Sequence, residues 1–269
     1  MEKQYFFLEN AHLAYQYINN HKQHTVLFIH GAGSNLRQFE KQVTYFSKKH
    51  NVLNVTLHGH DSACAESPLK KEDFRLEKLA KDVFELCASL EIQEVIIVGN
   101  SAGGLVGLEL LKQGDLTVKT LVTFGTSPRL VMPKFMVSLV SKIDARMIKK
   151  RPRKYLSFAV KACTKHPHVI KAMTAIMMES KHAAAYIRSQ IGRYDYLEVL
   201  EETSVPCYLL HGPMDKSINK SLKKIKKRLK AIDTLQWIYI DDSGHFMNLD
   251  QPEIFNSTID KIIENNIEQ

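Results

Sequence analysis

The chain has few of the features that mark membrane-spanning or disulfide-stabilised proteins. Its 269 residues contain no uninterrupted apolar run of about 18, the length that a transmembrane helix needs. The apolar run at residues 5–8 is too short for a signal peptide. The four cysteines are scattered and form no C-x-x-C pair, which argues against a zinc site and favours reduced thiols. We therefore expect a cytoplasmic protein without an integral membrane segment.

The sequence also lacks internal repeats, low-complexity linkers and nucleic-acid-binding motifs, and it indicates no metal or organic cofactor. Hydrophobic residues make up 44% of the chain and charged residues 25%, which suits a globular protein with one sizeable core. Nothing in the pattern fixes the oligomeric state.

Apolar runs alternate with amphipathic stretches along most of the chain. Helices are predicted near residues 35–48, 76–90, 102–113, 219–231 and 252–265. Strands are predicted near residues 25–30, 51–57, 94–99, 118–124, 205–211 and 235–241, after an N-terminal hairpin at 5–9 and 12–18. This alternation predicts an α/β fold with a mostly parallel sheet covered by helices on both faces.

The most specific motif is Gly-Asn-Ser-Ala-Gly at residues 99–103, which follows an apolar run and precedes a helical pattern. The order strand, G-x-S-x-G, helix is typical of a nucleophile elbow, a sharp turn that exposes a serine hydroxyl above the sheet. Gly99 and Gly103 would leave room for neighbouring backbone. Taken alone, the motif is also compatible with a glycine-rich turn that carries a spare serine, so the assignment of Ser101 depends on its companions.

Two companions follow predicted strands, in the chain order Ser, Asp, His. Asp215 could orient an imidazole and stabilise its charged form, although aspartate is also common in turns. His245 follows the last predicted strand, and a pKa near neutrality suits a general base. Asp241 and Asp242 are competing carboxylates, which we disfavour because they are so close to His245 along the chain.

A third companion is the loop that begins with His30 and Gly31, directly after a buried apolar run. Such a loop can lie beside a nucleophile elbow and supply a backbone N–H to an oxyanion. The expected donors are the N–H groups of Ala32 and Ala102. We expect His30 to hold this loop by hydrogen bonds rather than to act as a base.

Together the segments HGAGSN, LHGHDS, GNSAGG, HGPMD and SGHF make the chain resemble the α/β-hydrolase superfamily, in the subgroup with an HG oxyanion loop and a helical lid. The resemblance covers nearly the full length. It implies an eight-stranded, mostly parallel sheet, a triad of Ser101, Asp215 and His245, and an oxyanion hole at Ala32 and Ala102.

One segment departs from the family pattern D-x-x-G-H-G-x-S. Thr56 stands in place of the leading aspartate, and Asp61 in place of the second glycine. The conformation of this loop therefore cannot be carried over from the family, whereas the triad is unaffected.

The alternation of strands and helices stops between residues 129 and 203, which read as helices without a convincing strand. The superfamily inserts its lid here, so we expect a core of residues 1–128 and 204–269 and a lid of residues 129–203. The lid segment holds six methionines, which could form an apolar binding surface or ordinary helix packing. They are Met132, Met136, Met147, Met173, Met177 and Met178.

The same segment carries 15 Lys and Arg against six Asp and Glu, a net charge of +9 in a chain whose total is +8. The densest part is at residues 146–154. This charge could be a solvated face, a field that steers anionic substrates, or a contact with an acidic membrane or nucleic acid. The solvated face is the commonest of these.

The expected function is a serine hydrolase that cleaves small or medium carboxylic esters through an acyl-enzyme on Ser101. The expected partner is a small-molecule ester, apolar or anionic, and no nucleic acid. The same triad could instead serve a C–C bond hydrolase, a lyase or a thioesterase acting on an anionic substrate. A low-turnover ligand receptor or interaction module on the same fold is a further alternative.

Overall fold

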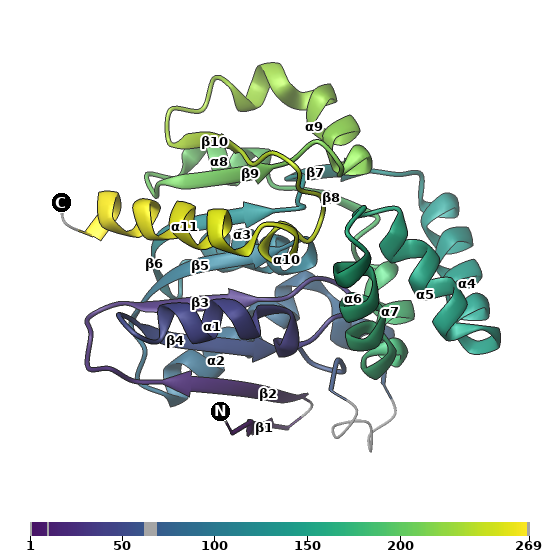
Figure 1. The fold of residues 1–269 in the computed structure, drawn as a ribbon, viewed down its shortest axis with the longest axis horizontal. Coiled ribbons are helices and arrows are strands. Elements are labelled where there is room, and N and C mark those ends of the chain that lie inside the picture. Colours follow the sequence, from purple (N-terminus) through teal and green to yellow (C-terminus); the bar gives the residue numbers. More distant parts are fainter. Residues whose placement is uncertain (1, 10, 62–68, 268–269) are drawn as a thin grey trace.

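An eight-stranded sheet runs through the centre of the protein (Figure 1). The computed structural model describes residues 2–9, 11–61 and 69–267. Strand β2 runs antiparallel to both of its neighbours, and every other adjacent pair is parallel, which confirms the predicted fold. In spatial order the strands are β1 (Gln4–Leu8), β2 (Ala11–Ile18), β4 (Asn51–Thr56), β3 (Thr25–Ile29), β5 (Glu94–Asn100), β6 (Thr117–Phe124), β9 (Cys207–His211) and β10 (Leu235–Tyr239).

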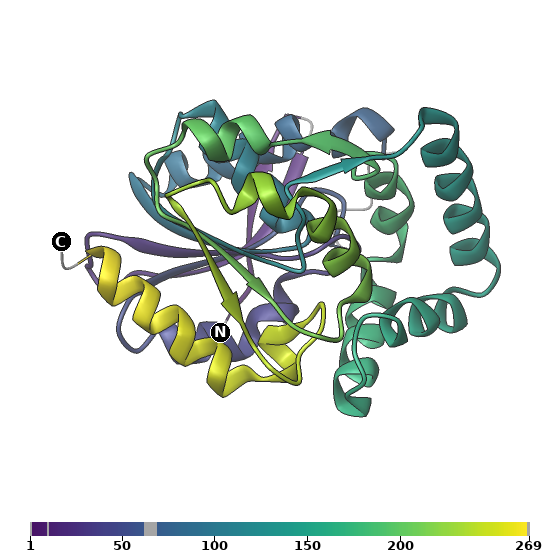
Figure 2. The ribbon, with the colours of Figure 1, turned by 90° about the horizontal axis from the view of Figure 1, so that it is seen from above.

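Helices cover both faces of the sheet because alternate side chains of the buried strands point to opposite sides. Leu27 and Ile29 of β3 face a cluster that includes α2, α3, α8 and α9, whereas Val26 and Phe28 face α1 and α11 (Figure 2). The helices of these layers and of the connecting loops are η1 (Leu36–Phe39), α1 (Glu40–Phe46), η3 (Lys71–Phe74), α2 (Leu76–Ser89), α3 (Ala102–Gln113), α8 (Leu197–Glu202), α9 (Lys216–Leu229), α10 (Met247–Asp250) and α11 (Pro252–Ile267).

Residues 132–192, here called the helical insertion, lie beyond the carboxyl ends of the parallel strands (Figures 1 and 2). The insertion holds α4 (Lys134–Lys150), α5 (Pro152–Lys161), α6 (Pro167–Glu179) and α7 (Lys181–Arg188). In the part of the chain that the structure describes, no helix has both the length and the apolarity to cross a membrane.

The expectation of no strand between residues 129 and 203 is wrong. Strands β7 (Arg129–Val131) and β8 (Arg193–Asp195) pair antiparallel and join the two ends of the helical insertion. Each strand has only three residues, too few for an alternating pattern to stand out in the sequence.

Two predicted helices begin or divide differently from expectation. Helix α9 begins at Lys216, three residues early, because the Asp215 side chain caps its N-terminus by accepting a hydrogen bond from the Ile218 N–H. The helix expected at residues 35–48 divides into the 3₁₀ helix η1 and the α-helix α1.

Candidate active site

Ser101 occupies the sharp turn between β5 and α3. Its φ of 52° and ψ of −113° are strained values for a residue with a side chain. A Cβ atom on Gly103 would lie 2.1 Å from the Ile29 carbonyl oxygen, and one on Gly99 would lie 2.6 Å from the Gly103 carbonyl oxygen. The two glycines are therefore required by close backbone contacts, as the motif predicted.

A cavity of about 480 Å³ lies above this turn, between the sheet and the helical insertion. Ser101 and His245 both line it, although they are 144 positions apart in the chain. Val160 and Met177 contribute apolar surface from the insertion, and Arg188 contributes a guanidinium. A serine hydroxyl, an imidazole and a mixed apolar and cationic wall thus face one space.

Asp215 contacts His245 directly. The Asp215 Oδ2 atom lies 2.5 Å from His245 Nδ1. The other carboxylate oxygen, Oδ1, accepts hydrogen bonds from the Ile218 N–H and the Ser217 hydroxyl, each at 3.2 Å. Asp215 is therefore both a helix cap and the partner of the imidazole, so the two interpretations of this residue are compatible.

Burial and pairing act in opposite directions on these two groups. Burial would lower the pKa of His245, but the charge and hydrogen bond of Asp215 more than offset it, so the pKa is raised. Burial would raise the pKa of Asp215, but His245 and the two capping donors hold it below its ordinary value. The site is therefore suited to stabilise an imidazolium beside a carboxylate.

The competing carboxylates point elsewhere. Asp242 accepts a hydrogen bond from the Gln251 side chain and lies 3.4 Å from His166 Nε2, with most of its side chain exposed. Asp241 accepts from the Tyr239 hydroxyl at 3.2 Å and is exposed. Asp215 is thus the carboxylate that meets His245.

The loop after β3 brings a second backbone segment to the cavity. Ala32 and Ala102 both line the cavity, and neither N–H donates a hydrogen bond to another of the described residues. Ala102 is also the first residue of α3, where the helix dipole favours negative charge. The two N–H groups are available to a ligand oxygen.

His30 holds this loop in the way that the sequence predicted. Its Nε2 atom accepts a hydrogen bond from the Leu57 N–H at 3.0 Å, so the proton is on Nδ1, which lies 2.7 Å from the Gly31 carbonyl oxygen. Burial holds the pKa of His30 well below its ordinary value. A neutral imidazole with both nitrogens engaged is a structural element rather than a base.

The segment that departs from the family pattern makes its own contacts. Thr56 accepts a hydrogen bond from the Leu36 N–H at 3.0 Å, which fixes the start of η1. Asp61 pairs with Lys3 at 2.9 Å. Ser62 and Ala63, which complete the segment, and Cys64 lie outside the described residues.

Asn100, within the elbow motif, has a role that the sequence analysis missed. Its Nδ2 atom donates to the His245 carbonyl at 2.8 Å and to the Phe124 carbonyl at 3.2 Å. Its Oδ1 atom accepts from Gln38 Nε2 at 2.9 Å, and Gln38 Oε1 accepts from the Gly31 N–H at 3.3 Å. Two fully buried amides thus join the elbow, the Gly31 loop and the His245 loop.

The helical insertion also holds the His245 loop. The His245 N–H donates to the Cys163 carbonyl at 2.9 Å. Asp250 accepts from the Gly244 N–H at 2.8 Å through Oδ2 and from the Thr164 hydroxyl at 2.5 Å through Oδ1. No signal in the sequence predicted the contacts of Cys163 and Thr164, because each joins residues more than 80 positions apart.

Most of the methionines and basic residues of the insertion lie outside the lining of the cavity. Of the six methionines, Met177 alone is among the described lining residues. The densest basic run, residues 146–154, contributes no lining residue. The cation that does line the cavity is Arg188, whose Nε atom lies 3.1 Å from the Asp144 carboxylate.

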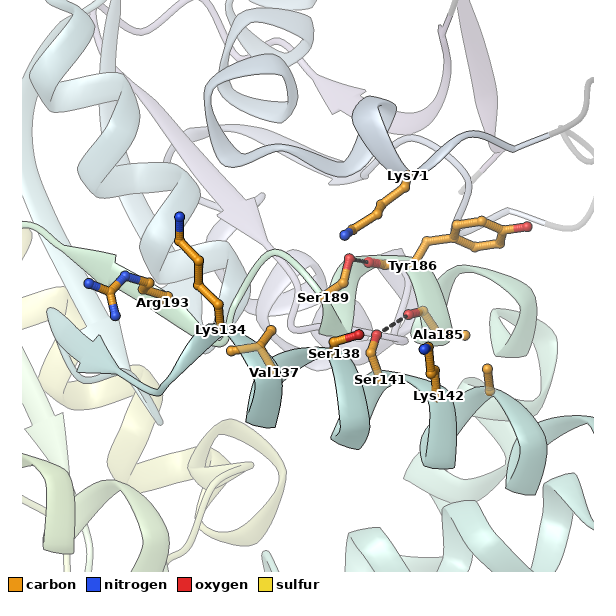
Figure 3. A pocket seen from close by; sticks show the side chains of 11 residues that line it. Lys71, Lys134, Val137, Ser138, Ser141, Lys142, Ala185, Tyr186, Ser189 and Arg193 are labelled. Atoms are coloured by element: carbon orange, nitrogen blue, oxygen red, sulfur yellow. Dashed lines mark hydrogen bonds between the residues drawn. The ribbon is translucent and has the colours of Figure 1, made fainter.

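A second cavity, of about 650 Å³, lies between α4, α7 and Lys71 (Figure 3). It is larger than the Ser101 cavity but more open, and its described lining brings no histidine or carboxylate to its serines. The smaller cavity is therefore the candidate site. Among residues 2–9, 11–61 and 69–267, no cluster of His, Cys, Asp and Glu has a geometry that could hold a metal ion.

Comparison with known proteins identifies the fold and the family of the chain. The chain is 19% identical to an esterase from Thermogutta terrifontis, whose structure superposes with a TM-score of 0.82 over 98% of this chain and 99% of that one. It is 20% identical to 3-oxoadipate enol-lactonase 2 of Acinetobacter baylyi, over 89% of this chain and 88% of that protein. A local match at 32% identity covers 32% of this chain and 29% of the magnesium-chelatase 30 kDa subunit of Rhodobacter capsulatus. The model of the α/β hydrolase family matches residues 26–258, and the chain belongs to that family.

Proposed function

We propose that this protein is a serine hydrolase that cleaves small or medium carboxylic esters through an acyl-enzyme on Ser101. The observation that carries the proposal is the contact of 2.5 Å between Asp215 and His245, in a cavity that Ser101 also lines. The esterase from Thermogutta terrifontis, which has the same fold, supports the choice of bond.

In this mechanism the Ser101 hydroxyl attacks the ester carbonyl carbon and passes its proton to His245 Nε2. Asp215 holds the Nδ1 proton and stabilises the imidazolium. The N–H groups of Ala32 and Ala102 bind the oxyanion, and in related enzymes one such donor is worth about 3–4 kcal/mol. His245 then protonates the leaving alcohol, and a water molecule releases the acid by the reverse sequence.

We propose that residues 129–203 act as a lid over a core of residues 1–128 and 204–269. Val160, Met177 and Ile191 come from this segment and line the cavity, which supports a role in holding the acyl group. A cytoplasmic location is supported by the thiols of Cys87, Cys163 and Cys207, which are free, and burial raises the pKa of each to about 12.

Labelling with a fluorophosphonate, together with turnover of p-nitrophenyl esters of rising acyl length, tests the proposal. Ser101→Ala should abolish both labelling and turnover. Ser221→Ala is the matched control, because Ser221 lines the same cavity and should leave both within about twofold.

Labelling that persists in Ser101→Ala would refute the nucleophile. Stoichiometric labelling of the wild-type protein without turnover of any ester would instead favour a low-turnover receptor. If the protein hydrolyses a lactone or a C–C bond but no simple ester, the proposed triad stands and the proposed substrate bond is wrong.

A second candidate, hydrolysis of an anionic substrate, is favoured by Arg188. Its guanidinium lines the cavity, where it could pair with a substrate carboxylate. The enol-lactonase of Acinetobacter baylyi, a relative, is named for a dicarboxylic compound. Arg188→Gln should raise KM for an anionic ester by about tenfold and leave a neutral ester of similar size nearly unchanged. Equal effects on the two esters would exclude this candidate.

A further inference from the structure

Helix α4 exposes a row of large apolar side chains. Phe135, Leu139 and Ile143 are 73%, 56% and 49% exposed, and Met147 continues the same spacing of four residues. Residues four apart lie on one face of a helix. An exposed, contiguous apolar row of this kind marks an interaction surface rather than the scattered apolar residues of an ordinary surface.

The row faces away from the rest of the molecule. Figure 3 shows the short side chains of Val137, Ser138 and Ser141 on the side of α4 that faces α7. Of the 17 residues in α4, only Asp144 and Ile148 are buried. Figures 1 and 2 both place α4 at the outer edge of the helical insertion, so no other described element covers the row.

Cations border the row. Lys142, Arg146, Lys149 and Lys150 are exposed on α4, and none of them forms an ion pair with another described residue. The one carboxylate of the helix, Asp144, is buried and pairs with Arg188. The outer surface of α4 is therefore apolar and cationic, with no exposed negative charge.

Helix α9 shows what a merely solvated basic helix looks like in this protein. It carries a similar density of lysines on its outer face, but its large apolar residues Leu222, Ile225 and Leu229 are buried. Charge alone therefore does not account for α4, whose apolar residues are on the outside. The combination of exposed apolar and basic residues is what distinguishes it.

We propose that α4 docks on the surface of an anionic lipid bilayer. Phe135, Leu139 and Ile143 would enter the boundary between headgroups and acyl chains, and the neighbouring lysines and arginine would contact the anionic headgroups. A second copy of the chain fits less well, because a symmetric contact would bring two cationic surfaces together. A nucleic acid would satisfy the charge but gives the apolar row no partner.

Helix α4 contributes no residue to the described lining of the Ser101 cavity, so the docking surface is separate from the candidate site. The interaction itself does not depend on the chemistry at Ser101. A protein that hydrolyses no ester would still bind vesicles, so failure of one proposal is distinguishable from failure of the other.

Sedimentation of the full chain with vesicles tests the proposal. The protein should bind phosphatidylcholine vesicles that contain phosphatidylglycerol, and it should bind pure phosphatidylcholine much more weakly. Leu139→Gln with Ile143→Gln should weaken binding at least about tenfold, because two large apolar groups no longer leave water. Lys142→Gln and Arg146→Gln should each weaken it about fivefold, and added salt should do the same.

Two matched controls separate α4 from general surface effects. Ile254→Gln on α11 removes an apolar side chain that is 53% exposed. Lys223→Gln with Lys227→Gln on α9 removes two charges, as many as Lys142→Gln and Arg146→Gln remove together. Both should leave vesicle binding within about twofold.

A fluorescent reporter gives a second measurement on an almost unmodified surface. Trp237 is the one tryptophan of the chain, so Phe135→Trp in a Trp237→Phe background places the only indole on α4. Its emission should shift to the blue when phosphatidylglycerol vesicles are added and should not shift with pure phosphatidylcholine.

Several outcomes would overturn the proposal. These are no sedimentation with phosphatidylglycerol vesicles, undiminished binding of the Leu139→Gln, Ile143→Gln variant, or equal losses from the α9 control. A wild-type dimer that the α4 variant converts to a monomer would instead make this face a self-association surface. If a short DNA duplex binds as tightly as the vesicles do, the interaction is electrostatic only and the apolar row has no part in it.

Discussion

At the scale of single residues, the two oxygens of the Asp215 carboxylate have separate tasks. Oδ2 meets His245, whereas Oδ1 caps α9. A change that alters one oxygen chemically can therefore leave the helix in place. This separation makes Asp215 a residue where effects on chemistry and on folding can be measured independently.

Asp215→Asn should lower turnover by about four orders of magnitude, because an amide favours the wrong imidazole tautomer. The cap on α9 should survive, since the asparagine oxygen also accepts hydrogen bonds, so the melting temperature should fall only slightly. Steady-state kinetics and thermal unfolding measure the two effects. Near-full activity of this variant, with an inactive Asp242→Asn, would show that the carboxylate was wrongly chosen.

The pH dependence of kcat/KM follows from the raised pKa of His245. The imidazole must be neutral to accept the serine proton, so activity rises as pH increases through this pKa. Because the pKa is raised, the acid limb should have its midpoint above the ordinary histidine value of about 6.5. In the residual activity of Asp215→Asn the midpoint should move to lower pH, because the group that raises the pKa is gone. A midpoint that stays in place would assign the limb to another group.

Asn100 is a positioning residue, because its amide binds Gln38 and the His245 carbonyl at the wall of the cavity. Asn100→Leu should leave the Gln38 amide and the His245 carbonyl without their partner and should destabilise the fold by about 1–3 kcal/mol. It should also lower kcat more than it raises KM. Asn54→Leu is the control, because Asn54 is equally buried and its Nδ2 atom bonds Gln16 and Leu36, away from the cavity. Asn54→Leu should lower the melting temperature similarly without the change in kcat.

At the scale of elements, the elbow shows how closely β3, β5 and α3 approach one another. Gly103→Ala should cost roughly 3 kcal/mol or more and lower the melting temperature by about 10 °C, because backbone atoms of Ile29 and His30 occupy the Cβ position. Gly114→Ala is the control: it has a positive φ of 73° but no atom within 4 Å of the new Cβ. It should cost only about 1 kcal/mol. A loss at Gly103 no larger than that at Gly114 would mean that the backbone contacts at Gly103 do not set its cost, because Gly103 has no positive φ.

The sequence predicted the sheet because long buried strands and amphipathic helices repeat regularly enough to be recognised. It missed β7 and β8 because three residues show no period. It placed the start of α9 late because Asp215 was interpreted as a catalytic group or a turn residue and not as a helix cap. Asn100 and Gln38 were missed for a different reason. Their roles depend on a hydrogen bond between side chains that are 62 positions apart in the chain, and the pattern of a single sequence does not indicate such contacts.

At the scale of the whole molecule, positive charge is concentrated in residues 129–203, which carry +9, whereas the remainder of the chain carries −1. Such a field raises the local concentration of anions and is screened beyond about 8 Å at physiological salt. We expect kcat/KM for an anionic ester to fall as ionic strength rises, while a neutral ester of similar size is little affected.

Replacing Lys149, Lys150, Arg151 and Arg153 together with Gln should remove most of that salt dependence and leave kcat for the neutral ester unchanged. The control variant replaces four lysines of α9 with Gln. It should retain most of the salt dependence, although it removes the same amount of charge. Stopped-flow or steady-state kinetics at several salt concentrations measure the slopes. If kcat/KM of the wild-type protein depends on salt equally for the two esters, the basic residues form only a solvated surface.

The paired strands β7 and β8 let the chain leave the sheet and return at one point, since Val131 lies opposite Arg193. Lengthening a loop that begins and ends together costs little entropy, so evolution can exchange this whole segment as a cassette without disturbing the strand register. The exchange has one condition. The His245 N–H takes its acceptor from the Cys163 carbonyl, a main-chain group that any amino acid provides. Side chains of this segment other than Thr164, whose hydroxyl binds Asp250, can therefore diverge toward new substrates while an unchanged backbone path continues to hold the His245 loop.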